Sequence, residues 1–519
     1  MTWAAPGSRR LRRGVAAFTV IVLAATSCSS DERAARAAPT TRPRTTTSTA
    51  PTTTPGRDRS GTSTTTVPPT AALEWTGCDG GLECAELAVP VDHARPAGET
   101  LTLGLARRTA TGDRIGSLLV NPGGPGGSAT SFVANKNFPA ELTERFDIVG
   151  FDPRGTGRSE ALSCRTHLLD LYDADPTLDD GADKKALLDA STAFVNECAT
   201  NHGDLLEHLG TVDVARDMEM VRASLGDEQL SYLGYSYGTS IGQQYARLFP
   251  TRVRAMVLDG VVDPSSTGIE SAVAQAKGFT ATLDAFIEDC AANDDCGLDA
   301  PAGDVIDDVF AASEKAPIPA EKADRPATPG VVTLAVTQAM YSEGLWPTLA
   351  RGLGQAQAGN ADGLVALADS YLKRNPDGSY PSGFEIYFAV SCLDAAWPTD
   401  PDAFFDAAAS AGAAYPRFGE AVVNDYVRCA LWPVPPQPLE AVTEAVEGLP
   451  PIVVISTTGD PATPYQSGVE VAGEIPGAVL VTNEGDRHTI YTQGKPCIDD
   501  PVTTYLVALT PPAEDLTCG

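Results

Sequence analysis

A serine stands between two glycines in the segment Gly234–Gly238, which reads GYSYG and matches the pattern G-x-S-x-G. This pattern forms a very tight turn between a strand and a helix. The nucleophile at its centre has a strained backbone, so the residues two positions away must be small. The apolar run Leu230–Leu233 precedes the segment and a helical pattern follows it. We therefore predict Ser236 as a nucleophile; the alternative is a glycine-rich turn without chemistry.

A serine hydroxyl is a weak nucleophile, so a general base must accompany it. The chain has five histidines, at positions 93, 167, 202, 208 and 488. Where the nucleophile lies in such a turn, the acid and then the histidine follow it along the chain. His488 is the only histidine after Ser236, and it lies in the loop NEGDRHT after an apolar run. We predict it as the base, against the alternative of a surface-loop histidine.

The acid of a catalytic triad fixes the tautomer of the histidine and stabilises its positive charge. Asp460 lies in a loop shortly after the apolar run Ile452–Ile455 and 28 residues before His488. Asp259 also ends a predicted strand and is the second candidate, whereas Asp486 is too close to His488 along the chain to orient it easily. We predict Asp460 as the acid and Asp259 as a structural turn residue.

Acyl transfer also requires N–H donors for the oxyanion of the tetrahedral intermediate. The backbone N–H of Tyr237, directly after the nucleophile, is one predicted donor. The second is Gly124, in the loop PGGPGG of residues 122–127, where glycines let backbone amides approach the substrate. A glycine-rich loop could instead bind phosphate, but no Lys-Ser or Lys-Thr pair follows these glycines, which excludes a P-loop.

Six short apolar runs, each followed by a turn rich in glycine or aspartate, predict the strands that carry these residues. They are Ser117–Val120, Phe146–Val149, Leu230–Leu233, Arg254–Leu258, Ile452–Ile455 and Ala478–Val481. Continuous apolar runs of this length are typical of strands buried on both faces of a parallel sheet. One helical pattern runs from Thr211 or Asp213 to a stop at Gly226, and another ends before Pro250. Strands alternating with helices predict an α/β sheet.

The alternation stops between about residue 264 and residue 436, where the sequence is rich in Ala, Asp and Gly and mostly helical in pattern. It returns at Pro450. Together with the nucleophile turn, this predicts an α/β-hydrolase fold with a mostly parallel central sheet and an inserted helical lid domain. We place the core in residues 73–263 and 437–519 and the lid in residues 264–436.

The first 28 residues have the features of an export signal. Arginines at positions 9, 10, 12 and 13 precede the apolar segment GVAAFTVIVLAATS, which at 14 residues is too short to span a bilayer comfortably. Ala25–Cys28 resembles a bacterial lipoprotein cleavage site, so we expect Cys28 to be lipidated; ordinary cleavage and free secretion are the alternative. Residues 29–72 are rich in Thr, Pro, Ser and Arg and predict a disordered tether.

Ten cysteines remain when Cys28 is set aside, and an even number in an exported chain favours disulfides. Sequence alone does not determine their connectivity. Pairing neighbours in order gives Cys78–Cys84, Cys164–Cys198, Cys290–Cys296, Cys392–Cys429 and Cys497–Cys518. No C-x-x-C pair is present, so a zinc ribbon has little support.

The 519 residues carry a formal net charge of −31, with 43% hydrophobic and 20% charged residues. This is an ordinary globular composition in a chain long enough for a large core and an inserted lid. So acidic a surface repels phosphate backbones, and nucleic acid is therefore not an expected partner. We interpret the acidity as keeping an exported protein soluble; a charge-selected substrate is the alternative.

Several of these motifs together resemble a known group of enzymes. The sequence PGGPG resembles the H-G-G-P-G box of prolyl aminopeptidases. FDPRGTGRS, GYSYGT, GDPATP and the His488 loop resemble the secreted tripeptidyl aminopeptidases of actinobacteria, which belong to the same peptidase family. The resemblance covers about residues 73–519. Asn121-Pro122 stands where prolyl aminopeptidases carry a histidine before the glycines, which favours the tripeptidyl branch.

This resemblance implies cleavage of short peptides from a free N-terminus, without a metal or a cofactor. The expected partner is a peptide or small protein substrate, and contact with a membrane is expected only through a lipid on Cys28. An aminopeptidase must also hold the substrate ammonium group, which requires a carboxylate in the lid. Glu385 and Asp394, in the stretch FEIYFAVSCLDA, are the candidates; both could equally be solvated helix charges.

Two other functions remain open on the sequence. A carboxylesterase or lipase acting on cell-envelope esters would use the same triad with a different lid pocket. A binding or scaffold protein that has lost catalysis is disfavoured by the complete set of Ser236, Asp460 and His488. An epoxide hydrolase or dehalogenase would require aspartate at position 236 and is excluded.

Overall fold

The structure, a computed structural model, describes residues 72–519 apart from 160–161, 179–180, 294–295 and 444–446. The predicted signal peptide, the lipidation site at Cys28 and the tether, except for its residue 72, lie outside the described residues. None of the helices within the described ranges is long and apolar enough to cross a membrane.

The described chain is built on a ten-stranded sheet with the order β1-β2-β3-β5-β4-β6-β7-β8-β9-β10. The strands are β1 Thr76–Cys78, β2 Leu82–Pro90, β3 Thr100–Arg108, β4 Gly116–Asn121, β5 Phe146–Phe151, β6 Leu230–Tyr235, β7 Val253–Asp259, β8 Ile452–Thr457, β9 Val479–Asn483 and β10 Leu516–Cys518. All six predicted strands are present, as β4 to β9, and neighbouring members pair in parallel, which confirms the α/β class.

Three further strands, β1 to β3, form an antiparallel extension at one edge that the sequence analysis did not predict. In β2, buried and exposed residues partly alternate. A search for continuous apolar runs overlooks such a strand, because only one of its faces packs on the core. The last strand, β10, also escaped prediction; it spans only three residues.

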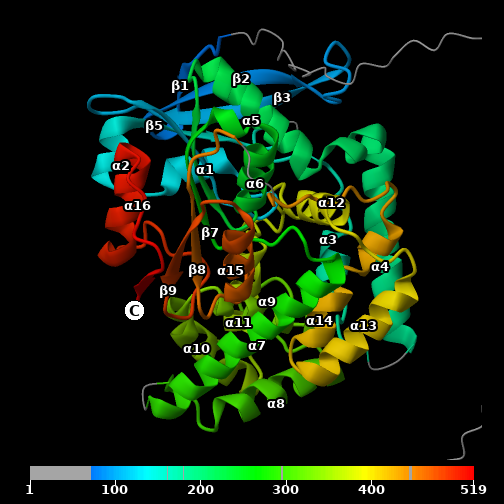
Figure 1. Cartoon of the computed structure of the whole chain (residues 1–519). Helices are drawn as coiled ribbons and strands as arrows, with labels where there is room; N and C mark the ends of the chain where they lie inside the picture. Colours follow the sequence, from blue (N-terminus) through cyan, green and yellow to red (C-terminus); the bar gives the residue numbers. More distant parts are fainter. Residues whose placement is uncertain (1–71, 160–161, 179–180, 294–295, 444–446) are drawn as a thin grey trace, which may run out of the picture. The chain divides into compact units, whose positions relative to one another are not determined.

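Helices cover both faces of the sheet (Figure 1). One face packs against α5 Thr211–Leu225, α6 Gly238–Leu248 and α15 Tyr465–Glu474. The other packs against α1 Ala129–Asn135, α2 Ala140–Arg145 and α16 Pro496–Ala508. The predicted helix end at Gly226 is confirmed, because this residue adopts a left-handed φ of 76° directly after α5. The two packed faces explain why the parallel strands are apolar throughout.

The chain between β7 and β8 is helical, as predicted (Figure 1). Its helices are α7 Gly268–Ala292, α8 Ala302–Lys315, α9 Pro329–Met340, α10 Trp346–Gln357, α11 Asp362–Tyr371, α12 Phe384–Asp394, α13 Pro401–Ala414 and α14 Gly419–Asn424. Helices α7 to α11 enclose a core of their own, which includes Phe279, Phe286 and Val336. The lid limits at residues 264 and 436 stay predictions.

Two helices between β5 and β6, α3 Leu168–Asp173 and α4 Gly181–His202, pack against this helical segment. Phe194 of α4, for example, lies edge-to-face against Phe388 of α12. Both helices lie within residues 73–263, the predicted core segment, and no sequence pattern indicates this contact.

Five disulfides cross-link the described residues, and all five are the pairs predicted from sequence order. They are Cys78–Cys84, Cys164–Cys198, Cys290–Cys296, Cys392–Cys429 and Cys497–Cys518. The bridge from Cys392 to Cys429 ties α12 to the end of the helical segment, and α12 contributes to the site described next.

Candidate active site

Ser236 lies at the turn between β6 and α6 with a φ of 53°, a left-handed conformation that is rare for any residue except glycine. Its N–H donates to the carbonyl oxygen of Asp259 at 2.8 Å. A Cβ atom on Gly234 would lie 2.5 Å from the carbonyl oxygen of Gly238. A Cβ atom on Gly238 would lie 2.8 Å from the carbonyl oxygen of Asn121. The sharp turn therefore requires both glycines of the motif.

The imidazole of His488 is bonded to Asp460, the acid predicted from the sequence. The Nδ1–H of His488 lies 2.9 Å from both carboxylate oxygens of Asp460. The carboxylate is itself buried and accepts hydrogen bonds from the N–H groups of Ala462 and Thr463 and from the Thr463 hydroxyl, each at 2.9 Å. With Nδ1 engaged, Nε2 is left without a hydrogen-bond partner among the described residues. His488 and Ser236 line the same cavity.

The environment of His488 acts on its pKa in opposite directions. Burial lowers the pKa, whereas the charge and hydrogen bond of Asp460 and the charge of Asp259 raise it, and the net result is a pKa above the ordinary value. Asp259, the second acid candidate, makes no hydrogen bond to the His488 ring; its carboxylate accepts the N–H groups of Ile490 and Tyr491.

The glycine-rich loop after β4 lies directly against the nucleophile turn. A Cβ atom on Gly123 would lie 2.8 Å from the Ser236 Cβ and 2.9 Å from the Tyr237 nitrogen. The N–H of Gly123 is engaged by the side chain of Asn121 at 2.9 Å. The N–H groups of Gly124 and Tyr237 donate no hydrogen bond within the described part of the chain. These are the two donors predicted for the oxyanion, and both residues line the cavity.

A buried aspartate that the sequence analysis missed anchors this loop. Asp152 accepts hydrogen bonds from the Ser128 hydroxyl at 3.0 Å, from the N–H and hydroxyl of Thr130 at 2.9 Å, and from the N–H of Arg158 at 2.8 Å. It therefore joins the residues that follow the glycine-rich loop to the FDPRGTGRS segment. The only sequence signal for this role is the position of Asp152 directly after a buried strand.

Replacing Gly123 with alanine is expected to lower kcat at least 100-fold, because the added methyl group would displace the loop or the Ser236 turn, and small displacements of reacting groups cost about this much. Gly477→Ala is the matched control: Gly477 has a similar positive φ of 78°, but its Cβ would meet nothing within 4 Å. Steady-state kinetics and thermal unfolding of both variants test whether the space at Gly123 is required for catalysis. Equal effects of the two substitutions on kcat would contradict this requirement.

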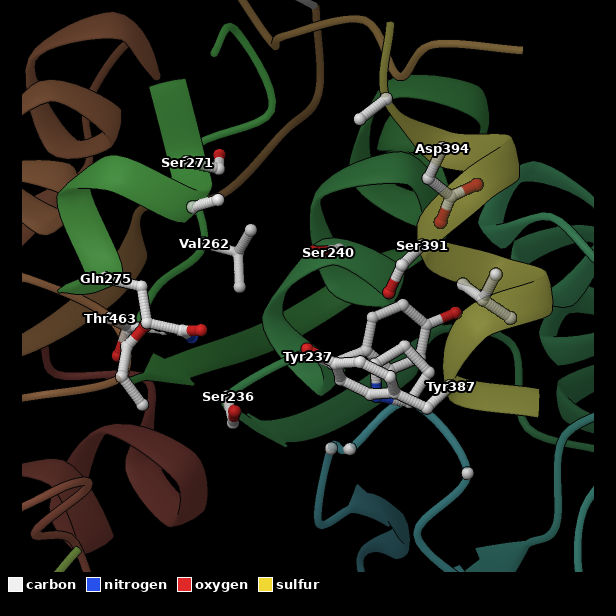
Figure 2. A pocket seen from close by; sticks show the side chains of 18 of the residues that line it. Ser236, Tyr237, Ser240, Val262, Ser271, Gln275, Tyr387, Ser391, Asp394 and Thr463 are labelled. Atoms are coloured by element: carbon white, nitrogen blue, oxygen red, sulfur yellow. Dashed lines mark hydrogen bonds between the residues drawn. The ribbon is translucent and has the colours of Figure 1, made fainter. Parts of the chain in front are cut away.

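A cavity of about 530 Å³ opens over Ser236 between the sheet edge and the helical segment. Figure 2 shows Ser391 and Asp394, both on α12, facing this space, with Ser271 and Gln275 of α7 across from them. Tyr387 closes one side. The volume is within the range of small-ligand pockets, and the walls combine aromatic and small polar side chains. The cavity therefore suits a short substrate that carries both polar and apolar groups.

Of the two lid carboxylates predicted to bind an ammonium group, Asp394 lines this cavity and Glu385 does not. The Asp394 carboxylate accepts hydrogen bonds from the N–H of Thr211 at 3.0 Å and from its hydroxyl at 2.5 Å. Burial raises the pKa of Asp394 to about 7. Thr211 is also hydrogen-bonded to the Tyr237 hydroxyl at 2.6 Å, so the carboxylate connects to a residue of the nucleophile turn.

The Glu385 carboxylate is turned to other partners. It accepts the N–H of Gly383 at 3.1 Å and lies 3.4 Å from the guanidinium of Arg165. Burial raises the pKa of Glu385 too. Glu385 is therefore not placed to contact a substrate in this cavity. Among the described residues, no group of three or more His, Cys, Asp or Glu side chains is placed to hold a metal ion.

The fold and this Ser–Asp–His arrangement define an α/β-hydrolase of the serine type. Residues 116–300 match the family model described as alpha/beta hydrolase fold, and residues 415–518 match the one described as TAP-like protein. Serine protease Hip1 of Mycobacterium tuberculosis is 40% identical over 476 residues, covering 86% of this chain and 91% of that protein.

Two further relatives are similar over most of the chain. Carboxylesterase B of Mycobacterium tuberculosis is 37% identical over 461 residues, covering 84% of this chain and 86% of that protein. Tripeptidyl aminopeptidase of Streptomyces lividans is 33% identical over 473 residues, covering 86% of this chain and 87% of that protein. The chain belongs to this family of α/β-hydrolase serine peptidases, which confirms the resemblance inferred from its motifs.

Proposed function

We propose that this serine peptidase is an aminopeptidase that releases short peptides, in the first place tripeptides, from free N-termini. The observation that carries the proposal is the partly buried carboxylate of Asp394, which lines the cavity of Ser236. A carboxylate that faces a substrate cavity is a specific partner for an ammonium group. The relative named tripeptidyl aminopeptidase supports the choice of tripeptides.

In this proposal Ser236 Oγ attacks the carbonyl carbon of the scissile bond while Nε2 of His488 takes the hydroxyl proton. The N–H groups of Tyr237 and Gly124 stabilise the oxyanion of the tetrahedral intermediate. His488 then passes the proton to the leaving amine, and the released N-terminal peptide remains as an ester on Ser236. Water, deprotonated by the same imidazole, hydrolyses this ester. Asp460 holds His488 in the tautomer that leaves Nε2 free to accept the proton.

The number of residues removed would follow from the distance between the ammonium anchor and the nucleophile. A peptide whose amine is held at Asp394 must extend across the cavity to place a carbonyl group at Ser236 (Figure 2). An N-acetylated peptide lacks the cation, so it would cover the Asp394 carboxylate without giving it a charged partner, which is costly. Selection for a free amine and for a short fixed length thus has a common origin.

A carboxylesterase acting on cell-envelope esters is the second candidate function, favoured by the similarity to carboxylesterase B. Two fluorogenic panels separate the functions: free and N-acetylated peptides of one to four residues, and acyl esters of rising chain length, with Ser236→Ala as the blank. We expect cleavage of free tripeptides that is lost on acetylation and in the blank. Cleavage of esters alone would replace the aminopeptidase proposal with the esterase one.

We also propose that the protein is exported and held at the outer face of the cytoplasmic membrane by a lipid on Cys28. The five disulfides support an oxidising compartment. The mass of the N-terminal peptide of the mature protein tests the anchor. A diacylglyceryl-modified cysteine as first residue is expected, and an unmodified N-terminus at another position would show free secretion instead.

A further inference from the structure

Asp259, at the end of β7, contacts both the nucleophile and the loop that carries the base, although it has no part in the proposed chemistry. It is fully buried and does not line the substrate cavity. Its backbone carbonyl oxygen accepts the N–H of Ser236 at 2.8 Å. One carboxylate oxygen, Oδ2, accepts the N–H groups of Ile490 at 2.9 Å and Tyr491 at 2.7 Å. A single residue thus bonds to the turn of Ser236 and to the loop of His488.

The loop held in this way has an unfavourable backbone conformation. Thr489, directly after His488, has a φ of 60°, and Thr492 has a φ of 65°. Both residues are β-branched, and a left-handed conformation is strained for such side chains. The two N–H groups that bond to Asp259 belong to the residues between them. Strained backbone persists only where the surroundings hold it in place. Here the Asp259 carboxylate bonds to the two residues that follow Thr489, whereas Asp499 bonds to Thr492 at the far end of the strained segment.

We propose that Asp259 is a positioning residue that fixes the separation of Ser236 and His488 by bonding to the backbone next to each of them. This inference rests on the proposed roles of Ser236 and His488. It does not rest on the identity of the substrate, because Asp259 lies outside the cavity.

The charge of Asp259 adds an electrostatic effect to this geometry. The charged or titratable groups that interact with it are His488, Asp460, Lys136 and Tyr235. Burial raises the pKa of Asp259 to about 6, while the N–H groups of the loop act in the opposite direction. Its negative charge also helps to raise the pKa of His488. Removing that charge lowers the pKa of His488, so the imidazole then stays neutral to lower pH.

Asp259→Ala and Asp259→Asn separate the two effects. Alanine leaves two buried N–H groups without an acceptor, and we expect kcat to fall at least 100-fold on a free tripeptide and on p-nitrophenyl acetate, with the KM of the tripeptide within three-fold. Asparagine keeps a carbonyl oxygen that can accept both bonds, so kcat should recover to within ten-fold of the wild type. The acid limb of kcat/KM should shift to lower pH in Asp259→Asn.

Asp499→Ala is the matched control for stability. The Asp499 carboxylate also accepts backbone N–H groups of this C-terminal loop, from Thr492 at 2.7 Å, Gly494 at 2.9 Å and Lys495 at 3.0 Å, but it is not bonded to Ser236. We expect a comparable fall in Tm with kcat within five-fold of the wild type.

Two results would overturn the positioning role: a kcat within three-fold of the wild type in Asp259→Ala, and an equal loss of kcat in Asp499→Ala. If the alanine variant does not fold, Asp259→Asn decides the matter, because a kcat more than ten-fold below that of the wild type would contradict the role of the side-chain oxygen as the acceptor of both N–H groups. A wild-type protein inactive on both substrates would instead refute the proposed function, and the two failures are therefore distinguishable.

Discussion

Replacing Asp460 with asparagine is expected to lower kcat about 10,000-fold with little change in KM, the loss typical of a triad whose histidine is held in the wrong tautomer. The hydrogen bonds around this side chain explain why. The N–H groups of Ala462 and Thr463 both donate to Oδ1. In an asparagine variant these donors select the carbonyl oxygen for that position and turn the NH₂ group toward His488. This NH₂ group donates to Nδ1 and so stabilises the tautomer in which Nε2 carries the proton, although Nε2 should instead remove the proton of Ser236.

Asp486→Asn is the control for this substitution, because Asp486 lies two residues from His488 but makes no hydrogen bond to its ring. Steady-state kinetics and thermal unfolding of both variants test whether Asp460 is the acid of the triad. The assignment of the acid fails if Asp460→Asn retains a tenth of wild-type kcat, or if both variants lose activity to the same extent.

Asp394→Asn is expected to discriminate between substrates with and without a free amine. For free tripeptides, kcat/KM should fall at least 100-fold, since losing one partner of a buried charge pair costs about 3 kcal/mol. For p-nitrophenyl acetate it should change less than three-fold. Asparagine can still accept the N–H of Thr211 through its carbonyl oxygen and can donate its NH₂ group to the Thr211 hydroxyl, so the helix contact is retained. Glu385→Gln alters a buried carboxylate of the same helix that lies outside the cavity and should leave both activities near wild type.

The pH dependence gives a second, independent readout of Asp394. Because its pKa is raised to about 7, the carboxylate is charged above that pH and neutral below it. Cleavage of free peptides should therefore fall below pH 7 because two groups become protonated: His488 is then no longer neutral, and Asp394 is no longer charged. Cleavage of the ester should depend on His488 alone. In Asp394→Asn, the pH profiles for peptide and ester cleavage should have the same steepness. If the peptide profile of the wild type is no steeper than its ester profile, Asp394 is excluded as the ammonium anchor.

The parts of the site that depend on local sequence could be predicted, and the parts that depend on tertiary packing could not. The turn around Ser236 is local, because its glycines are set by the space between one strand and the helix that follows. His488 followed from the order of the triad along the chain. Asp460 follows a strand and Asp259 ends one, and only the three-dimensional structure shows that the first bonds to the imidazole and the second to the loop behind it.

The helical spacing of the two lid carboxylates could have shown from the sequence that only one of them faces the cavity. Glu385 and Asp394 are nine positions apart, which is two and a half turns of an α-helix and places them on opposite sides of α12. They could not both face one cavity. Which side faces Ser236 depends on how α12 packs, and this packing involves α4 and a disulfide to the end of the lid.

The central claim is that Ser236 is the nucleophile, and covalent labelling tests it most directly. The signal-free protein is treated with a fluorophosphonate probe, and the modified peptide is mapped by mass spectrometry, with Ser236→Ala treated in parallel. We predict one adduct, on the peptide that contains GYSYG, together with complete loss of peptidase activity; the label should be absent from Ser236→Ala. An adduct on another residue, or hydrolysis that survives in Ser236→Ala, would contradict the mechanism.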